Sequence, residues 1–214
     1  AVVLAVVVLV VVVLWGTFSK KRRESDTVLS PEANIFKNTL GMKFVPVPGT
    51  KVLFCIWETR VKDYKAFVAA TGSDLPSWTK PESDMLAADA VEWEEAQAFC
   101  AWLTKKELAM GKIKAGQRYR LPTDAEWSMA VGLGQETGKS PREKNRKIKD
   151  VYPWGKDWPP PKGAGNYYDY VKADRYEGPS PVGSFAANVH GIHDLGGNMW
   201  EMCEDTMDPK SQLP

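Results

Sequence analysis

The sequence lacks an excess of charge of either sign. Its 214 residues include 28 lysines and arginines and 27 aspartates and glutamates, which gives a net charge of +1. Nucleic-acid binders need a strongly basic surface, so this balance predicts no nucleic-acid partner. Histidine is scarce, and His190 and His193 form an H-x-x-H pair without a partner cysteine or an H-E-x-x-H frame. This argues against a zinc site.

Cysteine is scarce as well, with Cys55, Cys100 and Cys203 only. No C-x-x-C pair occurs, which argues against a zinc ribbon and against a thioredoxin-like site. The odd count allows at most one internal disulfide and leaves the redox compartment open. Cys100 falls on an apolar helical stripe, where we expect a buried structural thiol. The acids around Cys203 should raise its pKa and make it a poor nucleophile.

An apolar run opens the sequence. Residues 1–18, "AVVLAVVVLVVVVLWGTF", contain no charge and precede a basic cluster at residues 20–23. The run is long enough for a membrane helix, and its basic residues follow it instead of preceding it, unlike in a signal peptide. We predict a transmembrane helix at 1–18, a basic and polar linker at 19–37, and hence a single-pass membrane protein. Only one flank is visible, so the orientation stays open. The initial alanine indicates a fragment.

Four segments carry clear secondary-structure signals. Residues 41–49 and 51–60 are rich in β-branched and aromatic side chains around a Pro-Gly break, which predicts two strands. Residues 61–71 and 93–107 place apolar side chains on one helical face, which predicts two helices. Gly72 is the expected stop of the first helix.

The block "RLPTDAEW" contains a helix start. Thr123 and Glu126 have the spacing of a capping box, and Asp124 adds negative charge near the helix N-terminus. Local chemistry therefore makes these residues a cap and not a catalytic site. The basic run at 139–149 is expected to be a solvated loop, with a phosphate-binding patch as the alternative.

Residues from 151 to the end are dominated by glycine, proline and aromatic residues without helical periodicity. Such irregular backbone must find hydrogen-bond partners, and a bound metal can organise it. The segment "GIHDLGGNMWEMCED", residues 191–205, supplies carboxylates and a flexible Gly-Gly pair, and calcium accepts mixtures of carboxylates and carbonyls. A second oxygen-rich segment, 163–178, contains Asn166, Asp169 and Asp174. Residue chemistry alone leaves a calcium site and a solvated acidic turn as alternatives.

Six blocks occur together in one order: "GMKFVPVPG", "WETRVKDYKAFV", "VEWEEAQAFCAWL", "YRLPTDAEWSMAV", "YPWG" and "PVGSFAANVHGIHDLGGNMWEMCED". From Asn38 to Asp208 the chain resembles the formylglycine-generating enzyme, or sulfatase-modifying factor, family. The resemblance implies an α+β fold, a variant of the C-type-lectin fold with little regular secondary structure and bound Ca²⁺. It implies one domain over 38–214 that is incomplete at its C-terminal end. Similar domains occur in large bacterial membrane proteins, some with a kinase across the membrane, which favours an extracytoplasmic domain.

The resemblance also assigns metal ligands. One calcium site would use the Asn166 side chain, the Tyr167 carbonyl, Asp174 and the Tyr176 carbonyl. The other would use four positions of the segment 191–205, namely Asp194, the Gly197 carbonyl, the Met199 carbonyl and Glu201. Trp200 would face a substrate groove.

Two functions remain open on this resemblance. The first is a non-catalytic module that binds a peptide, protein or glycan and is fused in some relatives to a protein kinase. The second is the N-terminal part of a copper-dependent oxidase that converts a sulfatase cysteine to formylglycine. The family's oxidases bind copper through two cysteines beyond the "WEW" block, and no cysteine of this chain corresponds to either. Copper is therefore expected only if a further C-terminal segment carries the pair. Met202 also replaces the usual second tryptophan, so the enzyme assignment stays open and this chain alone is expected to be inactive.

Overall fold

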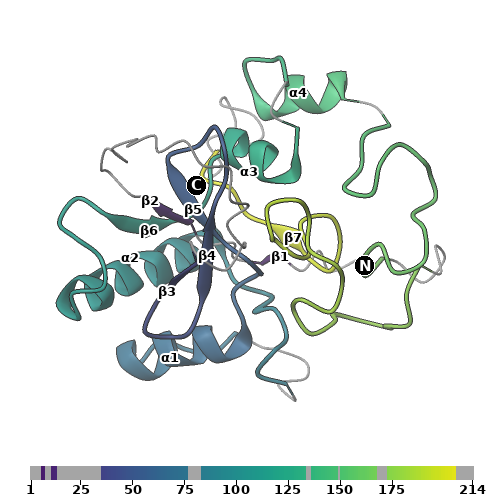
Figure 1. Cartoon of the computed structure of the whole chain (residues 1–214). Helices are drawn as coiled ribbons and strands as arrows, with labels where there is room; N and C mark the ends of the chain where they lie inside the picture. Colours follow the sequence, from purple (N-terminus) through teal and green to yellow (C-terminus); the bar gives the residue numbers. More distant parts are fainter. Residues whose placement is uncertain are drawn as a thin grey trace, which may run out of the picture.

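The computed structural model describes residues 6–7, 11–13, 35–76, 83–133, 136–148, 150–167 and 173–205. Figure 1 shows a small twisted sheet next to two longer helices, with long loops after residue 150 extending from the other side. The elements in chain order are β1 (Val6–Val7), β2 (Val11–Val13), β3 (Phe36–Lys37), β4 (Lys43–Pro46), β5 (Val52–Cys55), α1 (Val61–Thr71), α2 (Trp93–Ala109), β6 (Arg118–Arg120), α3 (Asp124–Val131), α4 (Pro141–Lys147) and β7 (Trp200–Glu201). The predicted mixture of helix, sheet and much irregular backbone is confirmed.

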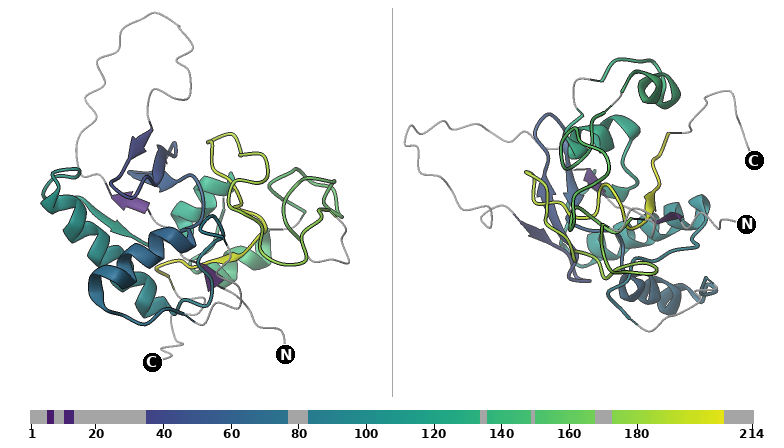
Figure 2. Two further views of the ribbon diagram at one scale, coloured as in Figure 1. Left: turned by 90° about the horizontal axis from the view of Figure 1, so that it is seen from below. Right: turned by 90° about the vertical axis from the view of Figure 1, so that its right-hand side faces the viewer.

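The main sheet has five strands in the order β3-β4-β5-β2-β6, and β1 pairs separately with β7 in parallel (Figure 2). β5 is the central hydrophobic strand, and all four of its residues are buried. Its side chains alternate between two cores, because successive residues of a strand point to opposite faces. Leu53 and Cys55 belong to the core beneath α1 and α2, whereas Val52 and Phe54 belong to the core that includes Ile192.

The core beneath α1 and α2 is aromatic. Tyr64, Phe67 and Phe99 pack with ring centroids 5.4–5.8 Å apart. Cys100 lies in the same core with 3 % of its surface exposed, which confirms the prediction of a buried thiol. The predicted helices at 61–71 and 93–107 are confirmed as α1 and α2, and α1 stops at Gly72, which has φ 73°.

The expectation of a membrane helix at residues 1–18 is corrected by the structure. The described residues of the expected membrane helix form strands: Val11–Val13 pair antiparallel with both β5 and β6. β-Branched valine favours extended backbone, and a strand in this position satisfies backbone groups of β5 and β6 that would otherwise lie at two sheet edges. Among the residues that the structure describes, no helix is long and apolar enough to cross a membrane. The remaining residues of 1–18, and most of the expected linker at 19–37, lie outside the described part.

The expectation that the basic run forms a loop is also corrected, because residues 141–147 form helix α4. Ser140 caps the helix by accepting a hydrogen bond from the Glu143 amide at 3.3 Å, and Pro141 stands in the first turn. Both are helix-start signals that the lysine and arginine content concealed. Lys144 anchors the helix by an ion pair of 2.6 Å with Asp124.

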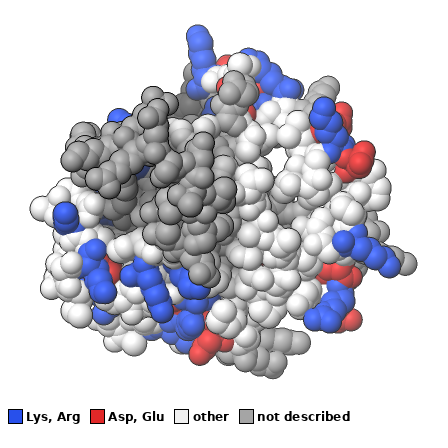
Figure 3. All heavy atoms as spheres, in the orientation of Figure 1, with Lys and Arg blue, Asp and Glu red and all other residues white. Residues whose placement is uncertain are grey.

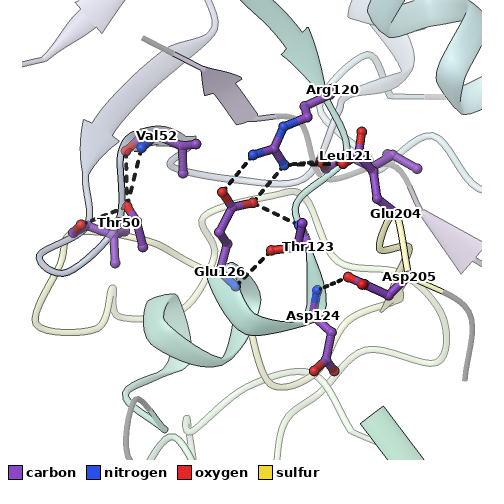
Figure 4. A network of polar contacts seen from close by, with 10 residues as sticks. Thr50, Val52, Arg120, Leu121, Thr123, Asp124, Glu126, Glu204 and Asp205 are labelled. Carbon is purple, nitrogen blue, oxygen red and sulfur yellow. Dashed lines mark hydrogen bonds and ion pairs between the residues drawn. The ribbon is translucent and has the colours of Figure 1, made fainter. Parts of the chain in front are cut away.

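The capping box at α3 is confirmed. The Thr123 hydroxyl accepts a hydrogen bond from the Glu126 amide at 3.2 Å, and the Glu126 carboxylate accepts one from the Thr123 amide at 2.9 Å. Arg120 at the end of β6 adds a bidentate ion pair to Glu126 with distances of 2.7 and 2.6 Å (Figure 4). In the "RLPTDAEW" block, the Glu126 carboxylate therefore links strand β6 to helix α3.

The cap predicts a measurable loss of stability. Thr123→Ala should lower the free energy of unfolding by roughly 0.5–2 kcal/mol, because the hydroxyl that satisfies the Glu126 amide is removed. Thr137→Ala is the matched control, since Thr137 is exposed. Denaturant unfolding of both variants checks the prediction. A Thr123→Ala variant as stable as Thr137→Ala would show that the cap contributes nothing.

Candidate metal-binding site

The segment 191–205 forms an irregular loop that follows the second core. Ile192 and Leu195 are buried in this core, and the His193 amide donates a 2.8 Å hydrogen bond to the Ile56 carbonyl. Asp194 and Asn198 adopt left-handed conformations with φ of 63° and 61°. Non-glycine residues are uncommon in this region, and Asp and Asn tolerate it best. Burial of Ile192 and Leu195 thus fixes a sharply turning backbone, and the polar groups of this backbone segment face one another.

The Asp194 and Glu201 carboxyls are only partly satisfied. Asp194 Oδ2 accepts a 2.7 Å hydrogen bond from the Gly183 amide. Asp194 Oδ1 and Glu201 Oε1 are buried without a hydrogen-bond partner among the described residues. Buried carboxylate oxygens without partners are costly, and a cation is one group that can satisfy them.

Burial shifts both acids toward their neutral forms. Burial, together with the nearby Asp194 charge, raises the pKa of Glu201 to about 8. Burial likewise raises the pKa of Asp194 above its usual value. A divalent cation between them would reverse this effect, because it favours the ionised forms.

Glu58 is a third acid at this place, and the sequence analysis did not identify it. It is fully buried, its Oε1 atom has no partner among the described residues, and burial together with Glu201 and Asp194 raises its pKa. Glu58 follows β5 in the "CIWETR" segment, more than a hundred residues away in the chain. The only local signal was an acid three residues after the end of a fully apolar strand, and such an acid is usually solvated.

The four residues of the other predicted site also come together. The Asp174 carboxylate accepts hydrogen bonds of 2.7 Å from the amides of both Tyr167 and Tyr176. Asn166 precedes Tyr167 and is buried. Asp174 therefore joins the two stretches of chain whose carbonyls were predicted as ligands. The third acid of this segment, Asp169, lies outside the described residues.

Asn198 connects the two sites. Its backbone amide donates to the Asn166 carbonyl at 2.8 Å, and its side-chain oxygen accepts from the Asn166 side-chain amide at 3.0 Å. Its own amide group donates to Glu58 Oε2 at 2.7 Å. Ser180 adds hydrogen bonds to the same side-chain oxygen from its amide at 2.8 Å and its hydroxyl at 3.1 Å. Sequence reasoning passed over Asn198, although an asparagine after two glycines is a signal for left-handed backbone.

The donor set fits calcium better than zinc. Among the described residues no group of three or more acidic, histidine or cysteine side chains is arranged to hold a metal ion. A cation here would therefore need backbone carbonyls as well as carboxylates. Calcium accepts such mixed oxygen ligands in irregular geometry, whereas zinc prefers compact sets of nitrogen and sulfur. The Gly197 carbonyl is partly used, since it accepts a 2.7 Å hydrogen bond from the Met199 amide.

Trp200 and Cys203 flank Glu201. The Trp200 side chain is 68 % exposed and is not in the wall of the hollow of about 200 Å³ that adjoins Asp194. Its predicted role in a substrate groove stays a prediction. Burial and four neighbouring acids raise the pKa of Cys203 to about 12, as the sequence analysis expected.

The end of the segment is fixed to α3. Asp205 accepts a 2.6 Å hydrogen bond from the Asp124 amide, and the Glu204 amide donates to the Pro122 carbonyl at 2.8 Å. Glu204 also lies 3.6 Å from Arg120 (Figure 4). The residues on both sides of Glu201 are thus anchored, by Ile192 and Leu195 before it and by the α3 start after it.

Formylglycine-generating enzymes, an inactive relative and a protein kinase are similar to this chain in sequence. A formylglycine-generating enzyme of Thermomonospora curvata is 31 % identical over 54 % of this chain and 32 % of its own length. The inactive C-alpha-formylglycine-generating enzyme 2 of Mus musculus is 32 % identical over 57 % of this chain and 33 % of its own length. The serine/threonine-protein kinase pkn1 of Chlamydia caviae is 24 % identical over 89 % of this chain and 26 % of its own length. The chain thus matches about a third or less of the length of these relatives.

The fold also has a solved neighbour. The structure of PvdO from Pseudomonas aeruginosa matches with a TM-score of 0.50 at 21 % identity and covers 76 % of this chain and 70 % of that one. The sulfatase-modifying factor enzyme 1-like domain model matches residues 8–212. The sequence blocks, the fold and this match together lead to one conclusion, that the chain belongs to the sulfatase-modifying factor enzyme 1-like family.

Proposed function

We propose that this chain is a calcium-stabilised, non-catalytic member of its family that binds a peptide, protein or glycan. One observation carries the calcium part of the proposal: Glu58, Asp194 and Glu201 influence one another's pKa, and each keeps a buried carboxyl oxygen without a hydrogen-bond partner among the described residues. Asp194, Glu201 and the carbonyls of Gly197 and Met199 would hold one ion. The Asn166 and Asp174 side chains with the carbonyls of Tyr167 and Tyr176 would hold the other.

The ion would act as a structural crosslink. When bound, it supplies positive charge to ionised carboxylates that burial otherwise disfavours. The chain itself orients the ligands: Gly183 fixes Asp194 by its amide, and the α3 start fixes the residues after Glu201. A cation bound only by the folded chain stabilises it by mass action.

The chain's own cysteines do not supply a copper site. All three are free thiols. Burial raises the pKa of Cys55 to about 12 and that of Cys100 still further, and Cys203 lies among acids. A nucleophilic or copper-binding thiol has to ionise near neutral pH. None of these three thiols fits that requirement.

An oxidase assay tests the non-catalytic part of the proposal directly. The complete protein, with any segment that follows residue 214, is incubated with copper, oxygen and a peptide that carries a sulfatase-type substrate cysteine, and the peptide is analysed for aldehyde by mass spectrometry. We expect no aldehyde beyond that in a sample without protein. Aldehyde that depends on the protein would support the alternative, a copper-dependent formylglycine-generating oxidase.

We further propose that residues 1–18 attach the protein to a membrane and that the complete protein carries a kinase. The charge-free run followed by a basic cluster supports attachment. The similarity to a Chlamydia caviae serine/threonine-protein kinase over 89 % of this chain supports the fusion. Attachment as a membrane helix requires Val6–Val7 and Val11–Val13 to leave β1 and β2.

Cell fractionation decides between these two states of the run. A membrane-attached chain should sediment with membranes and be released by detergent but not by high salt, because apolar burial and not charge would hold it. Recovery of the intact chain without detergent would contradict attachment. The matched control is the same chain with Leu4, Val8 and Leu14, none of which belongs to β1 or β2, all replaced by lysine, which should lose membrane association.

A further inference from the structure

A hollow of about 490 Å³ lies next to the predicted calcium site of Asp174 and is formed by residues 162–163, 173–176 and 184–186. It adjoins the smaller hollow near Asp194, with which it shares Gly163, Phe185 and Ala186. None of its lining residues belongs to a helix or a strand. Its shape therefore depends on loops, and the residues that line it decide what it can bind.

One wall of the hollow is aromatic and hydroxylated. The rings of Tyr176 and Phe185 meet edge to face, with centroids 6.0 Å apart and planes at 69°. The Tyr176 hydroxyl lies 3.4 Å from the Ser184 hydroxyl. The Ser184 hydroxyl donates its proton to the Pro181 carbonyl at 2.5 Å, so it can only accept a hydrogen bond from a ligand, whereas the Tyr176 hydroxyl can exchange the weak mutual bond for one to a ligand. This wall offers an apolar surface, the Tyr176 hydroxyl as donor and acceptor, and the Ser184 hydroxyl as acceptor.

Two positively charged side chains line the same hollow. Lys162 and Arg175 line it, and the Arg175 guanidinium lies 5.6 Å from the centre of the Tyr176 ring. Neither cation has an ion pair with another residue that the structure describes. The carboxylate in the wall, Asp174, is engaged by the amides of Tyr167 and Tyr176. Arg175 and Lys162 are therefore the groups that can meet a negative ligand.

We propose that this hollow binds an acidic sugar, with its carboxylate or sulfate group between Lys162 and Arg175. The apolar face of the sugar ring would pack on Tyr176 and Phe185, and its hydroxyls would bond with those of Tyr176 and Ser184. A cavity of this size accommodates about one or two sugar rings. A guanidinium binds a planar carboxylate or a sulfate through two parallel hydrogen bonds. The proposal rests on the ligand-binding function proposed above and names the class of ligand.

An acidic peptide fits this hollow less well. Extended peptides are usually bound along an open strand edge or in a long groove. Here the walls contain no strand. Figure 3 shows blue and red side chains interspersed on the side formed by the loops after residue 150, around a hollowed surface. Without a broad positive field, recognition depends on the two cations in the hollow, which suits one acidic group and not a run of them.

Calorimetric titration with defined ligands tests the proposal. Glucuronate and glucose 6-sulfate are the acidic probes, glucose is the neutral probe, and a poly-glutamate peptide represents an acidic protein, all with calcium present. We expect both acidic sugars to bind at least about tenfold more tightly than glucose. They should also bind at least about tenfold more tightly than the peptide, when the affinity of the peptide is divided by its number of carboxylates. The sugar with the lower dissociation constant identifies whether carboxylate or sulfate is preferred.

Variants locate the binding. Arg175→Ala and Lys162→Ala should each weaken acidic-sugar binding about tenfold, and Arg175→Lys should keep part of it. Lys156→Ala is the matched control, since Lys156 is exposed and does not line the hollow. The proposal is wrong if glucose binds as tightly as glucuronate, if the peptide binds best, or if Lys156→Ala weakens binding as much as Arg175→Ala. If the protein does not bind the sugars but is still stabilised by calcium, this inference alone is wrong. The proposal of a calcium-stabilised domain is then unaffected.

Discussion

Calcium should raise the melting temperature of this chain, and the increase should grow as the pH rises from about 4.5 to about 8. Burial raises the pKa of Glu201 from 4.5 to about 8, and it raises the pKa of Asp194 and Glu58 as well. In this window the metal-free folded state binds more protons than the unfolded state does. Its stability therefore falls as the pH rises through the window. Bound calcium should restore the loss, because it would stabilise the ionised carboxylates.

The expected size follows from mass action. Free calcium at about a hundred times its dissociation constant stabilises the folded state by about 2.7 kcal/mol. For a domain of this size that corresponds to a rise in melting temperature of roughly 5–10 °C for each ion bound, so the two proposed ions together should give about twice that. Magnesium should give much less, because it requires tight octahedral geometry that irregular loop carbonyls do not supply. Calorimetric melts with calcium, magnesium or chelator at pH 5 and pH 8 measure the effect.

A charge-removing variant assigns the effect to the site. Glu201→Gln should reduce the calcium-dependent rise at pH 8 and should remove much of the pH dependence in chelator. Glu177→Gln is the matched control, because Glu177 is exposed. If the Glu201→Gln protein responds to calcium as fully as the Glu177→Gln protein does, calcium binds elsewhere.

Asn198→Ala should be among the most destabilising single substitutions in the described residues. The change removes a 2.7 Å hydrogen bond to the buried Glu58 carboxyl and the acceptor used by Asn166 and Ser180. Each buried polar group that loses its partner costs about 1–3 kcal/mol. Since Glu58 and Ser180 are fully buried, water does not readily replace the lost side chain. We expect the free energy of unfolding to fall by about 3–5 kcal/mol.

Backbone strain must be separated from the lost hydrogen bonds, since Asn198 has φ 61°. Asn198→Gly removes the same hydrogen bonds but relieves any left-handed strain, so most of the loss should remain. Asn145→Ala, at an exposed position of α4, should change stability by less than about 0.5 kcal/mol. Denaturant unfolding of the three variants checks these values. If Asn198→Gly is as stable as the unsubstituted chain, the hydrogen bonds of Asn198 contribute little.

Local features of the fold were accessible from the sequence. The capping box at Thr123 and the helix stop at Gly72 depend on residues close together in the chain, and both occur as expected. The valine run shows the limit of local reasoning. Its length is sufficient for a membrane-spanning helix, and its β-branched residues also favour a strand in a sheet. Pairing of Val11–Val13 with β5 and β6 decides its conformation here, and such pairing is a long-range property.

The candidate site was only partly predictable. Acids within 191–205 are visible as a local cluster, and the family resemblance assigns them to calcium. Glu58 and Asn198 are 140 residues apart and meet only in the fold. Their burial is what distinguishes them from ordinary polar loop residues, and burial is not encoded in a short segment. The neighbouring hollow depends likewise on two loops that come together, at Arg175 and at Phe185.

The central claim is that this chain binds calcium through the residues of its two oxygen-rich segments. The most direct measurement is the number of calcium ions bound per chain, determined by isothermal titration of chelator-treated protein. We predict two ions for the unsubstituted chain. We predict one ion for the chain with Asp194→Asn and Glu201→Gln combined. No bound calcium in the unsubstituted chain, or the same number in both proteins, would contradict the account.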